Sequence, residues 1–249
     1  MKFLVKSFLL LGILCLPSAS YTQTLGEVLY KKEMIIPDEI FGSLKNTNPQ
    51  LYRQRLNTLH DIAQVTAEIE YSLIFNENES LFRPKEIMGK DESLFGSIQS
   101  RTGIFYNNTS SNNHLQQIER QGKTFLITRK DVTWKITDET KTINGLRSQK
   151  AVAKRNYYHV RTNKNIVRTI VAWFAPEIPV SFGPDGFGGL PGLILELEIA
   201  NERYYVVDVD LKRTTQKIHK PTKGEEVTFE EYQNILAQMG ERFRQFQGI

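Results

Sequence analysis

The sequence has few of the residues that most often build reactive or metal-binding sites. Its 249 residues include one cysteine, Cys15, and four histidines, and no two of these histidines stand at metal-ligand spacing. A single cysteine forms no internal disulfide. The signature motifs of phosphate-binding loops, α/β-hydrolases and zinc proteases are absent as well. We therefore expect no metal centre, no cofactor and no catalytic residues of these kinds.

Long apolar runs are also scarce, and the clearest one lies at the N-terminus. Lys2 and Lys6 precede an apolar run over residues 8–16, and small residues follow it. This pattern predicts a secretory signal peptide over residues 1–20. A membrane anchor is the alternative, but the run is shorter than the roughly 20 apolar residues that span a bilayer. We expect a cysteine-free mature chain, residues 21–249, without a transmembrane span, located in the periplasm, at the outer membrane or outside the cell.

Short runs of alternating polar and apolar residues predict a β-rich domain. Two such runs lie in the first third of the chain, and others recur about every ten residues from position 115 onward. The later runs cover residues 115–120, 123–129, 132–137, 140–145, 148–158, 166–174, 192–200, 203–212 and 216–220. This spacing is typical of an antiparallel meander, sandwich or barrel.

Two helices are expected beside these strands. Apolar residues at helical spacing predict an internal helix from Leu51 to Val65. Thr228 and Glu231 form a capping box, and Tyr232, Ile235, Leu236, Met239 and Phe243 follow on one helix face. We therefore predict a single, mainly β domain (α+β). It would be a curved antiparallel sheet, half-barrel or sandwich-like, with the internal helix and the C-terminal helix packed on it.

Glycine and proline are concentrated in the loop over residues 183–192, which contains five glycines and two prolines. Glycine permits close backbone approach and proline fixes φ, so we expect this loop to adopt a defined conformation. One interpretation is a loop that contacts a ligand or a partner, and the other is a buried corner where a strand changes direction. The residues of interest in either case are Trp173, Gly183, Pro184, Gly189, Leu190, Pro191 and Gly192.

Residues 189–194, Gly-Leu-Pro-Gly-Leu-Ile, resemble the motif for which the GLPGLI proteins of Bacteroidota are named. Other segments similar to landmarks of that family are Gly26-x-Val28-x-Tyr30, Trp134–Ile143, Gln149–Ala151, Ala172–Phe174 and Glu177–Pro179. Ser148 stands where family members often carry a cysteine, so no thiol role is carried over. The resemblance covers nearly the whole mature chain. It implies an exported, β-rich envelope protein of a Gram-negative bacterium, without established catalytic residues or a known substrate.

Charges are segregated along the chain. No acidic residue lies between Thr140 and Pro176, and no basic residue lies from Thr169 to Glu202. On adjacent strands the two blocks would form cross-strand ion pairs. Alternatively, the basic block forms an anion-binding surface for lipopolysaccharide phosphates or an acidic partner, through Lys150, Lys154, Arg155, Arg161 and Arg168. Nucleic acid is not expected as a partner of an exported protein, and removal of Lys2 and Lys6 lowers the formal net charge from +4 to +2.

Two carboxylate pairs occur at strand spacing, Glu196 with Glu198 and Asp208 with Asp210. Each pair lies on one strand face, where it would hold a cation or divide acid and base roles. Apolar residues alternate with both pairs, which favours a solvated outer face instead.

Three functions follow from these patterns. The first is a non-catalytic envelope protein whose concave side binds an apolar, lipid-like ligand or a protein partner. Its aromatic lining would be Trp134, Tyr157, Trp173, Phe182 and Phe187. The alternative is an accessory subunit of an outer-membrane complex that docks through residues 183–192. The third is an enzyme, which requires a carboxylate pair to converge with a histidine in a cleft.

Overall fold

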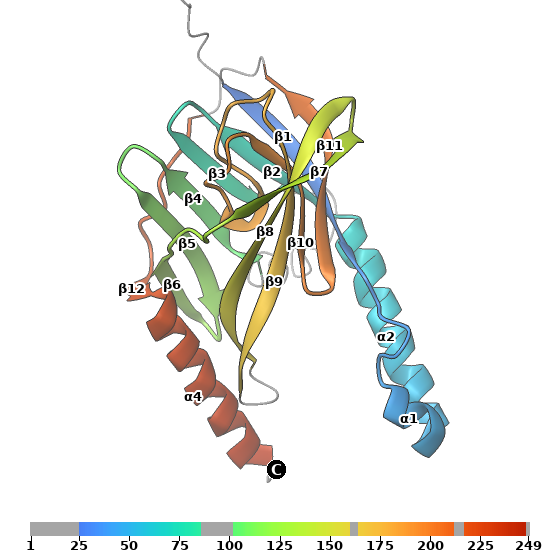
Figure 1. Cartoon of the computed structure of the whole chain (residues 1–249). Helices are drawn as coiled ribbons and strands as arrows, with labels where there is room; N and C mark the ends of the chain where they lie inside the picture. The colour runs from blue at the N-terminus through green and yellow to red at the C-terminus, as the bar shows by residue number, and fades with distance from the viewer. Residues whose placement is uncertain (1–24, 86–101, 160–163, 212–216, 248–249) are drawn as a thin grey trace, which may run out of the picture.

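The computed structural model describes residues 25–85, 102–159, 164–211 and 217–247, and it is mostly β-sheet (Figure 1). The expected signal peptide over residues 1–20 lies outside the described residues. Within the described ranges, none of the helices combines the length and the apolar character that a bilayer-spanning helix requires.

In the described residues, twelve strands form one open sheet. Their bounds are β1 (Gly26–Met34), β2 (Glu70–Phe75), β3 (Glu79–Pro84), β4 (Ile104–Asn108), β5 (Asn113–Arg120), β6 (Lys123–Thr128), β7 (Lys135–Ile143), β8 (Leu146–His159), β9 (Lys164–Ala175), β10 (Leu193–Ile199), β11 (Glu202–Asp210) and β12 (Glu225–Thr228). Their order is β12-β6-β5-β4-β3-β2-β1-β11-β10-β9-β8-β7. Two antiparallel meanders, β2–β6 and β7–β11, therefore lie side by side, and β1 joins them by pairing with both β2 and β11.

The sheet is mixed, so the expectation of a purely antiparallel sheet is wrong at one edge. β12 pairs with β6 in parallel, from Glu225 opposite Phe125 to Thr228 opposite Thr128. A tight hairpin forces antiparallel pairing, whereas β12 follows β11, which is separated from β6 by several strands, so the connection is long enough for parallel pairing. The strand predicted over residues 216–220 is also wrong, because residues 217–220 are irregular. Ile218 packs there on apolar side chains of the outer sheet face instead of pairing with a strand.

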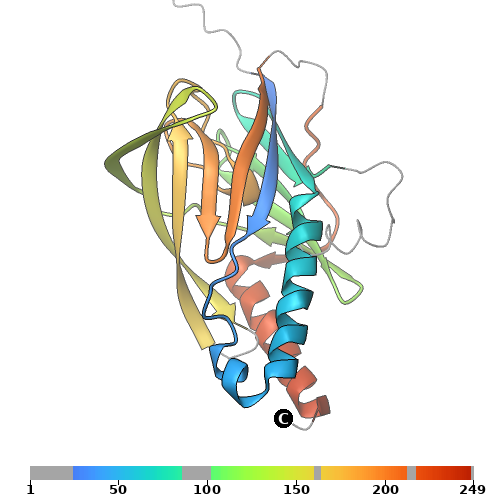
Figure 2. The ribbon, with the colours of Figure 1, turned by 90° about the vertical axis from the view of Figure 1, so that its right-hand side faces the viewer.

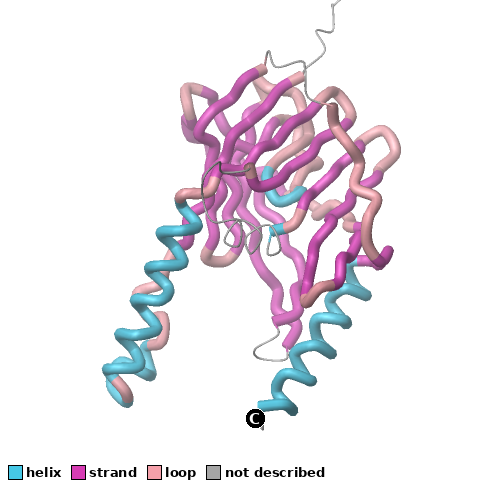
Figure 3. Tube along the Cα trace, turned by 180° about the vertical axis from the view of Figure 1, so that it is seen from behind, coloured by secondary structure: helices cyan, strands magenta, loops and turns pink. Residues whose placement is uncertain are grey.

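The described helices are α1 (Gly42–Thr47), α2 (Pro49–Ala67), the 3-10 turn η1 (Pro184–Gly186) and α4 (Phe229–Gln247). The predicted internal helix is confirmed as α2, whose first turn is capped where the Asn48 side chain accepts a hydrogen bond from the Leu51 amide (3.0 Å). α1 was not predicted because its six residues are too few for a periodic pattern. Figures 1 and 3 show that α2 and α4 extend from the same end of the sheet, on either side of the β8–β9 hairpin.

The capping box at the start of α4 is confirmed. The Thr228 amide donates to Glu231 Oε2 (2.7 Å), and the Glu231 amide donates to Thr228 Oγ1 (3.2 Å). Tyr232 packs on the ring of Phe125 in β6, with the half-buried Ile235, Leu236 and Met239 beside it. The predicted apolar helix face thus contacts the sheet, while the side chain of Phe243 lies outside the described residues.

The main core lies on the inner face of the curved sheet (Figure 2). Tyr30 of β1 is fully buried, and its hydroxyl donates to the carbonyl oxygen of Ile194 in β10 (2.6 Å). This carbonyl lies where the register of β10 on β9 shifts, between Ile194 and Glu196. Because a buried carbonyl without a partner costs free energy, the tyrosine both fills the core and stabilises the irregularity.

Candidate functional site

The Gly/Pro-rich loop between β9 and β10 folds onto the inner face of the sheet and forms part of the core. Phe182 bridges to Gly188 across the loop, and the Ile194 amide donates to the Phe182 carbonyl oxygen (3.0 Å). Phe182, Phe187 and Leu190 are each no more than 2% exposed. Of the residues of interest in the loop, Gly183, Pro184, Leu190 and Gly192 are buried, whereas Gly189 and Pro191 are exposed. The loop therefore has the packing of a buried corner and offers little surface for docking.

The five aromatic residues expected to line a concave surface do not meet on one surface. Phe182 and Phe187 belong to the core, and Trp134 packs on Phe187 and donates from Nε1 to the Gly188 carbonyl oxygen (2.8 Å). Trp173 is half-buried beneath the ammonium group of Lys141, 4.3 Å from the ring centroid. The loop thus fills the part of the inner face around Phe182 and Phe187.

Below the loop, the inner face encloses a cavity of about 440 Å³ between the sheet, α2 and α4. Its lining consists of Lys32, Met34, Ile62, Thr66, Ile69, Tyr71, Thr102, Phe105, Gln116, Ile118, Arg120, Arg129, Tyr157, Arg168, Asp185, Glu202, Tyr204, Phe229, Tyr232, Gln233 and Leu236. The most deeply buried members include Tyr71, Tyr204 and Arg129, whereas Ile62 of α2 is 37% exposed. The floor of the inner cavity therefore combines polar groups with apolar side chains such as Ile69 and Phe105, and apolar helix residues contribute to the rim.

Two arginines, Arg129 and Arg168, line the inner cavity, and Arg155 lies beside them. We call these three residues the arginine cluster. Arg155 of β8 stands directly opposite Arg168 of β9 in the sheet register. Arg129 follows β6, and its guanidinium lies 5.6 Å from the ring centroid of Phe187, while that of Arg155 lies 4.6 Å from the same centroid. Both arginines also lie over Phe229. Two guanidinium groups thus share the same aromatic rings.

The arginine cluster carries positive charge that no carboxylate balances within ion-pair distance in the described part of the chain. Arg129 donates from Nη1 to the Asp185 carbonyl oxygen (3.1 Å), and Arg155 from Nη2 to that of Lys130 (2.8 Å). Arg129 Nε, Arg155 Nη1 and Arg168 Nε are buried without a hydrogen-bond partner among those residues. Burial, followed by the positive charge of Arg155, lowers the pKa of Arg129 to about 10, so it remains charged at neutral pH.

Acidic and phenolic groups lie at the floor of the inner cavity. Burial raises the pKa of the Asp185 carboxyl to about 6, although the charges of Arg129 and Lys32 act in the opposite direction. Burial also raises the pKa of Tyr204 well above its usual value, and Asp185 contributes through its charge and a hydrogen bond. The Tyr71 hydroxyl is buried without a hydrogen-bond partner of normal geometry in the described ranges.

The predicted anion-binding residues are separated by the structure. Arg155 and Arg168 join the arginine cluster, whereas Lys150 forms an ion pair with Glu139 (2.9 Å). Lys154, next to Arg155 in β8, is exposed, and Arg161 lies outside the described residues. The expectation that the basic and acidic blocks pair across the sheet is wrong for Arg155 and Arg168. The register of β8 and β9 places these two basic residues directly opposite each other.

Sequence reasoning missed Arg129 and Lys32, which come from outside the basic block. A usable signal was the phase of the alternation in β8, where Ala151 and Ala153 are buried and Arg155 follows in the same phase. A cation in phase with buried residues faces the core side of a strand. The alternation therefore places Arg155 on the same strand face as Ala151 and Ala153, and the structure shows that this face is the inner one.

The two carboxylate pairs do not line the inner cavity, and no described histidine lines it either. Asp208 is exposed, as expected for an outer face. The expectation of a solvated face is wrong for Glu196, which is 7% exposed and accepts a hydrogen bond from Lys141 Nζ (2.8 Å). The reason is that Lys141 of the edge strand β7 reaches over the sheet and covers this carboxylate, together with Trp173.

Replacing Lys141 by methionine is expected to lower the free energy of unfolding by about 1–3 kcal/mol, because it leaves the buried Glu196 carboxylate without its partner. Urea unfolding at neutral pH measures this change. In a Glu196→Gln background, the same replacement should lower the free energy of unfolding by clearly less. Equal costs in both backgrounds would show that the ion pair does not stabilise the fold.

Comparisons with known proteins agree with a β-rich fold and do not assign a function. A family described as a protein of unknown function (Porph_ging) matches residues 158–196, a range that includes Arg168 and the Gly/Pro-rich loop. No curated protein sequence matches the chain. The crystal structure of PNGF-II in space group C2 is similar, with a TM-score of 0.50 and 16% identity over 86% of this chain. A second structure, in space group P21, has a TM-score of 0.48 and 15% identity over the same share of this chain.

The chain spans 33% of the PNGF-II chain in both structures. At this identity the likeness concerns the fold alone. The chain is thus similar to a family of unknown function over residues 158–196, and in fold to part of PNGF-II.

Proposed function

We propose that the protein is an exported, non-catalytic envelope protein that binds an anionic, lipid-like ligand in the inner cavity. The observation that carries this proposal is the arginine cluster, in which Arg129, Arg155 and Arg168 gather without a carboxylate within ion-pair distance among the described residues. Like charges directly opposite on neighbouring strands destabilise a sheet. Partly buried charges without partners cost further free energy. A bound anion would offset both costs.

The chemistry of arginine favours a carboxylate or phosphate group as the bound anion. A guanidinium group presents a planar fork of N–H donors that matches two oxygens of either group. Three nitrogens of the cluster are buried without a hydrogen-bond partner in the described part of the chain, so the donor capacity of the cluster is not fully used.

The cavity walls favour a ligand that also has an apolar part. Ile62 of α2, Leu236 of α4, Met34 and Ile69 lie among the lining residues. A volume of about 440 Å³ falls in the range of small-molecule sites. The anionic group would contact the arginine cluster, and the apolar part would lie between the two helices. In this proposal the curved sheet acts as a half-barrel, and export depends on the signal peptide expected over residues 1–20.

Calorimetry with octyl phosphate, and with octyl glucoside as an uncharged ligand of equal chain length, tests the proposal. Replacing Arg168 by glutamine is expected to weaken the binding of octyl phosphate about tenfold or more, because a charge-assisted hydrogen bond contributes about 1.5–3 kcal/mol. Lys135→Gln is the matched control, since Lys135 is exposed and does not line the cavity. Equal binding of the two ligands, or equal binding by wild type and Arg168→Gln, would contradict the proposal.

A further inference from the structure

A second cavity, of about 500 Å³, lies next to the inner cavity. It is lined by Arg129, Lys130, Asp131, Val132, Thr133, Lys154, Arg155, Asn156, Tyr157, Tyr158, Asn165, Phe229, Glu230, Gln233 and Asn234. Four residues line both cavities, namely Arg129, Tyr157, Phe229 and Gln233. The two cavities are therefore neighbours that share one wall, at the beginning of α4.

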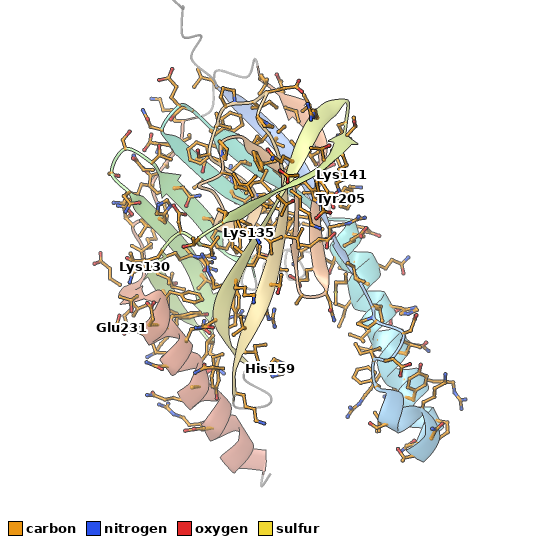
Figure 4. All side chains as sticks on the ribbon, viewed as in Figure 1. Lys130, Lys135, Lys141, His159, Tyr205 and Glu231 are labelled. Atoms are coloured by element: carbon orange, nitrogen blue, oxygen red, sulfur yellow. The ribbon has the colours of Figure 1, made fainter. Side chains whose placement is uncertain are left out.

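The arginine cluster is divided between the two cavities. Arg168 lines the inner cavity, Arg155 lines the second cavity, and Arg129 lines both. The second cavity adds Lys130 and Lys154, and Figure 4 shows Lys130 beside the start of α4. Each cavity thus has its own cations, and one shared arginine stands between them.

The acidic residues of the second cavity do not neutralise these cations. Asp131 lies 3.5 Å from the ring of His114, and Glu230 is exposed. No ion pair within the described ranges includes Lys130, Lys154 or Arg155. The buried Nη1 of Arg155 has no hydrogen-bond partner in those ranges. The second cavity therefore has positive charge for an anion of its own.

The shared wall also sets how far apart two bound anions would be. The guanidinium groups of Arg129 and Arg155 lie within 6 Å of the same Phe187 centroid. The wall is held in place where the Tyr158 amide of β8 donates to Gln233 Oε1 of α4 (2.6 Å). The two guanidinium groups therefore lie no more than about 10 Å apart, a span that one ligand with two linked anionic groups can bridge.

We infer that the second cavity is a second anion subsite, and that the ligand carries two anionic groups joined by a short link, as a diphosphate does. Arg168 and Arg129 hold one group in the inner cavity, and Arg155 and Lys154 hold the other in the second cavity. This inference rests on the proposed function and names the class of head group that the site takes.

Calorimetry with inorganic phosphate and pyrophosphate tests the inference. The wild-type protein is expected to bind pyrophosphate at least tenfold more tightly than phosphate. Replacing Lys154 by glutamine should weaken pyrophosphate binding about fivefold and leave the binding of octyl phosphate unchanged. Lys154 is exposed, so this variant is expected to fold normally. Lys164→Gln, from the same basic block but outside both cavities, controls for the change in net charge.

Two results would overturn the second subsite. The first is that the protein binds octyl phosphate through Arg168 but binds pyrophosphate no more tightly than phosphate, or does not bind pyrophosphate at all. The second is that Lys154→Gln and Lys164→Gln weaken pyrophosphate binding equally, because an equal effect would reflect the change in net charge alone. Failure of octyl phosphate to bind, or to respond to Arg168→Gln, would instead contradict the proposed function.

Discussion

The Gly192→Ala variant is expected to lose about 3 kcal/mol or more of its free energy of unfolding. An added Cβ at this position would lie 2.3 Å from the Ala175 carbonyl oxygen and 2.8 Å from the Pro176 nitrogen. These are backbone atoms at the end of β9, where Ala175 pairs with Leu193. The clash can be relieved only by separating β9 from β10, so the cost should reach or exceed the upper end of the about 1–3 kcal/mol typical of overpacking.

Pro191 provides a control within the same hexapeptide, because it is exposed and adjacent to Gly192. Pro191→Ala should change the free energy of unfolding by no more than about 0.5 kcal/mol, as expected for a surface substitution. Urea denaturation of both variants measures the difference. If Gly192→Ala were as stable as the wild type, β9 and β10 would not approach each other so closely at this corner.

The Asp185→Asn variant is expected to be more stable than the wild type at pH 8, by about 3 kcal/mol, and to lose this advantage near pH 4. Burial raises the pKa of Asp185 from 3.8 to about 6 in the folded protein. Between these values the folded state binds more protons than the unfolded state, so wild-type stability falls as the pH rises from about 4 to about 6. A pKa difference of one unit corresponds to about 1.4 kcal/mol.

Asparagine is a suitable replacement because it does not ionise and tolerates the left-handed backbone of Asp185, whose φ is 56°. Urea unfolding at pH 4, 6 and 8 gives the pH dependence of the difference between variant and wild type. Asp138→Asn, at an exposed position of β7, is the control and should show little pH dependence. A difference for Asp185→Asn that is the same at all three pH values would rule out the raised pKa as its cause.

Elements that depend on nearby residues could be predicted from the sequence. The helix over Leu51–Val65 and the capping box of Thr228 and Glu231 are both confirmed, because spacing and capping act within a few residues. Most strands follow from alternation for the same reason. The parallel strand β12 could not be predicted, since its pairing depends on the route that the chain takes across the sheet.

The candidate site was predicted only in part, because its residues converge through the order of the strands. Arg155 and Arg168 belong to the basic block, but alternation alone does not say which sheet face curves inward. Lys32 of β1 and Arg129 after β6 join the cavity because β1 lies between the two meanders and the sheet curves around the loop. No local pattern in the sequence contains that information.

The position of β1 also has a consequence for how the protein folds. Each meander consists of sequential antiparallel neighbours, so it can assemble from contacts that are close in the chain. β1 instead pairs with β11, from Glu27 opposite Asp210 to Met34 opposite Glu202, which closes a loop that contains most of the chain. Closure of long loops costs conformational entropy and slows folding. Until β1 is inserted, β2 and β11 expose unpaired edges that can pair with other molecules, so the first strand of the domain protects it from aggregation.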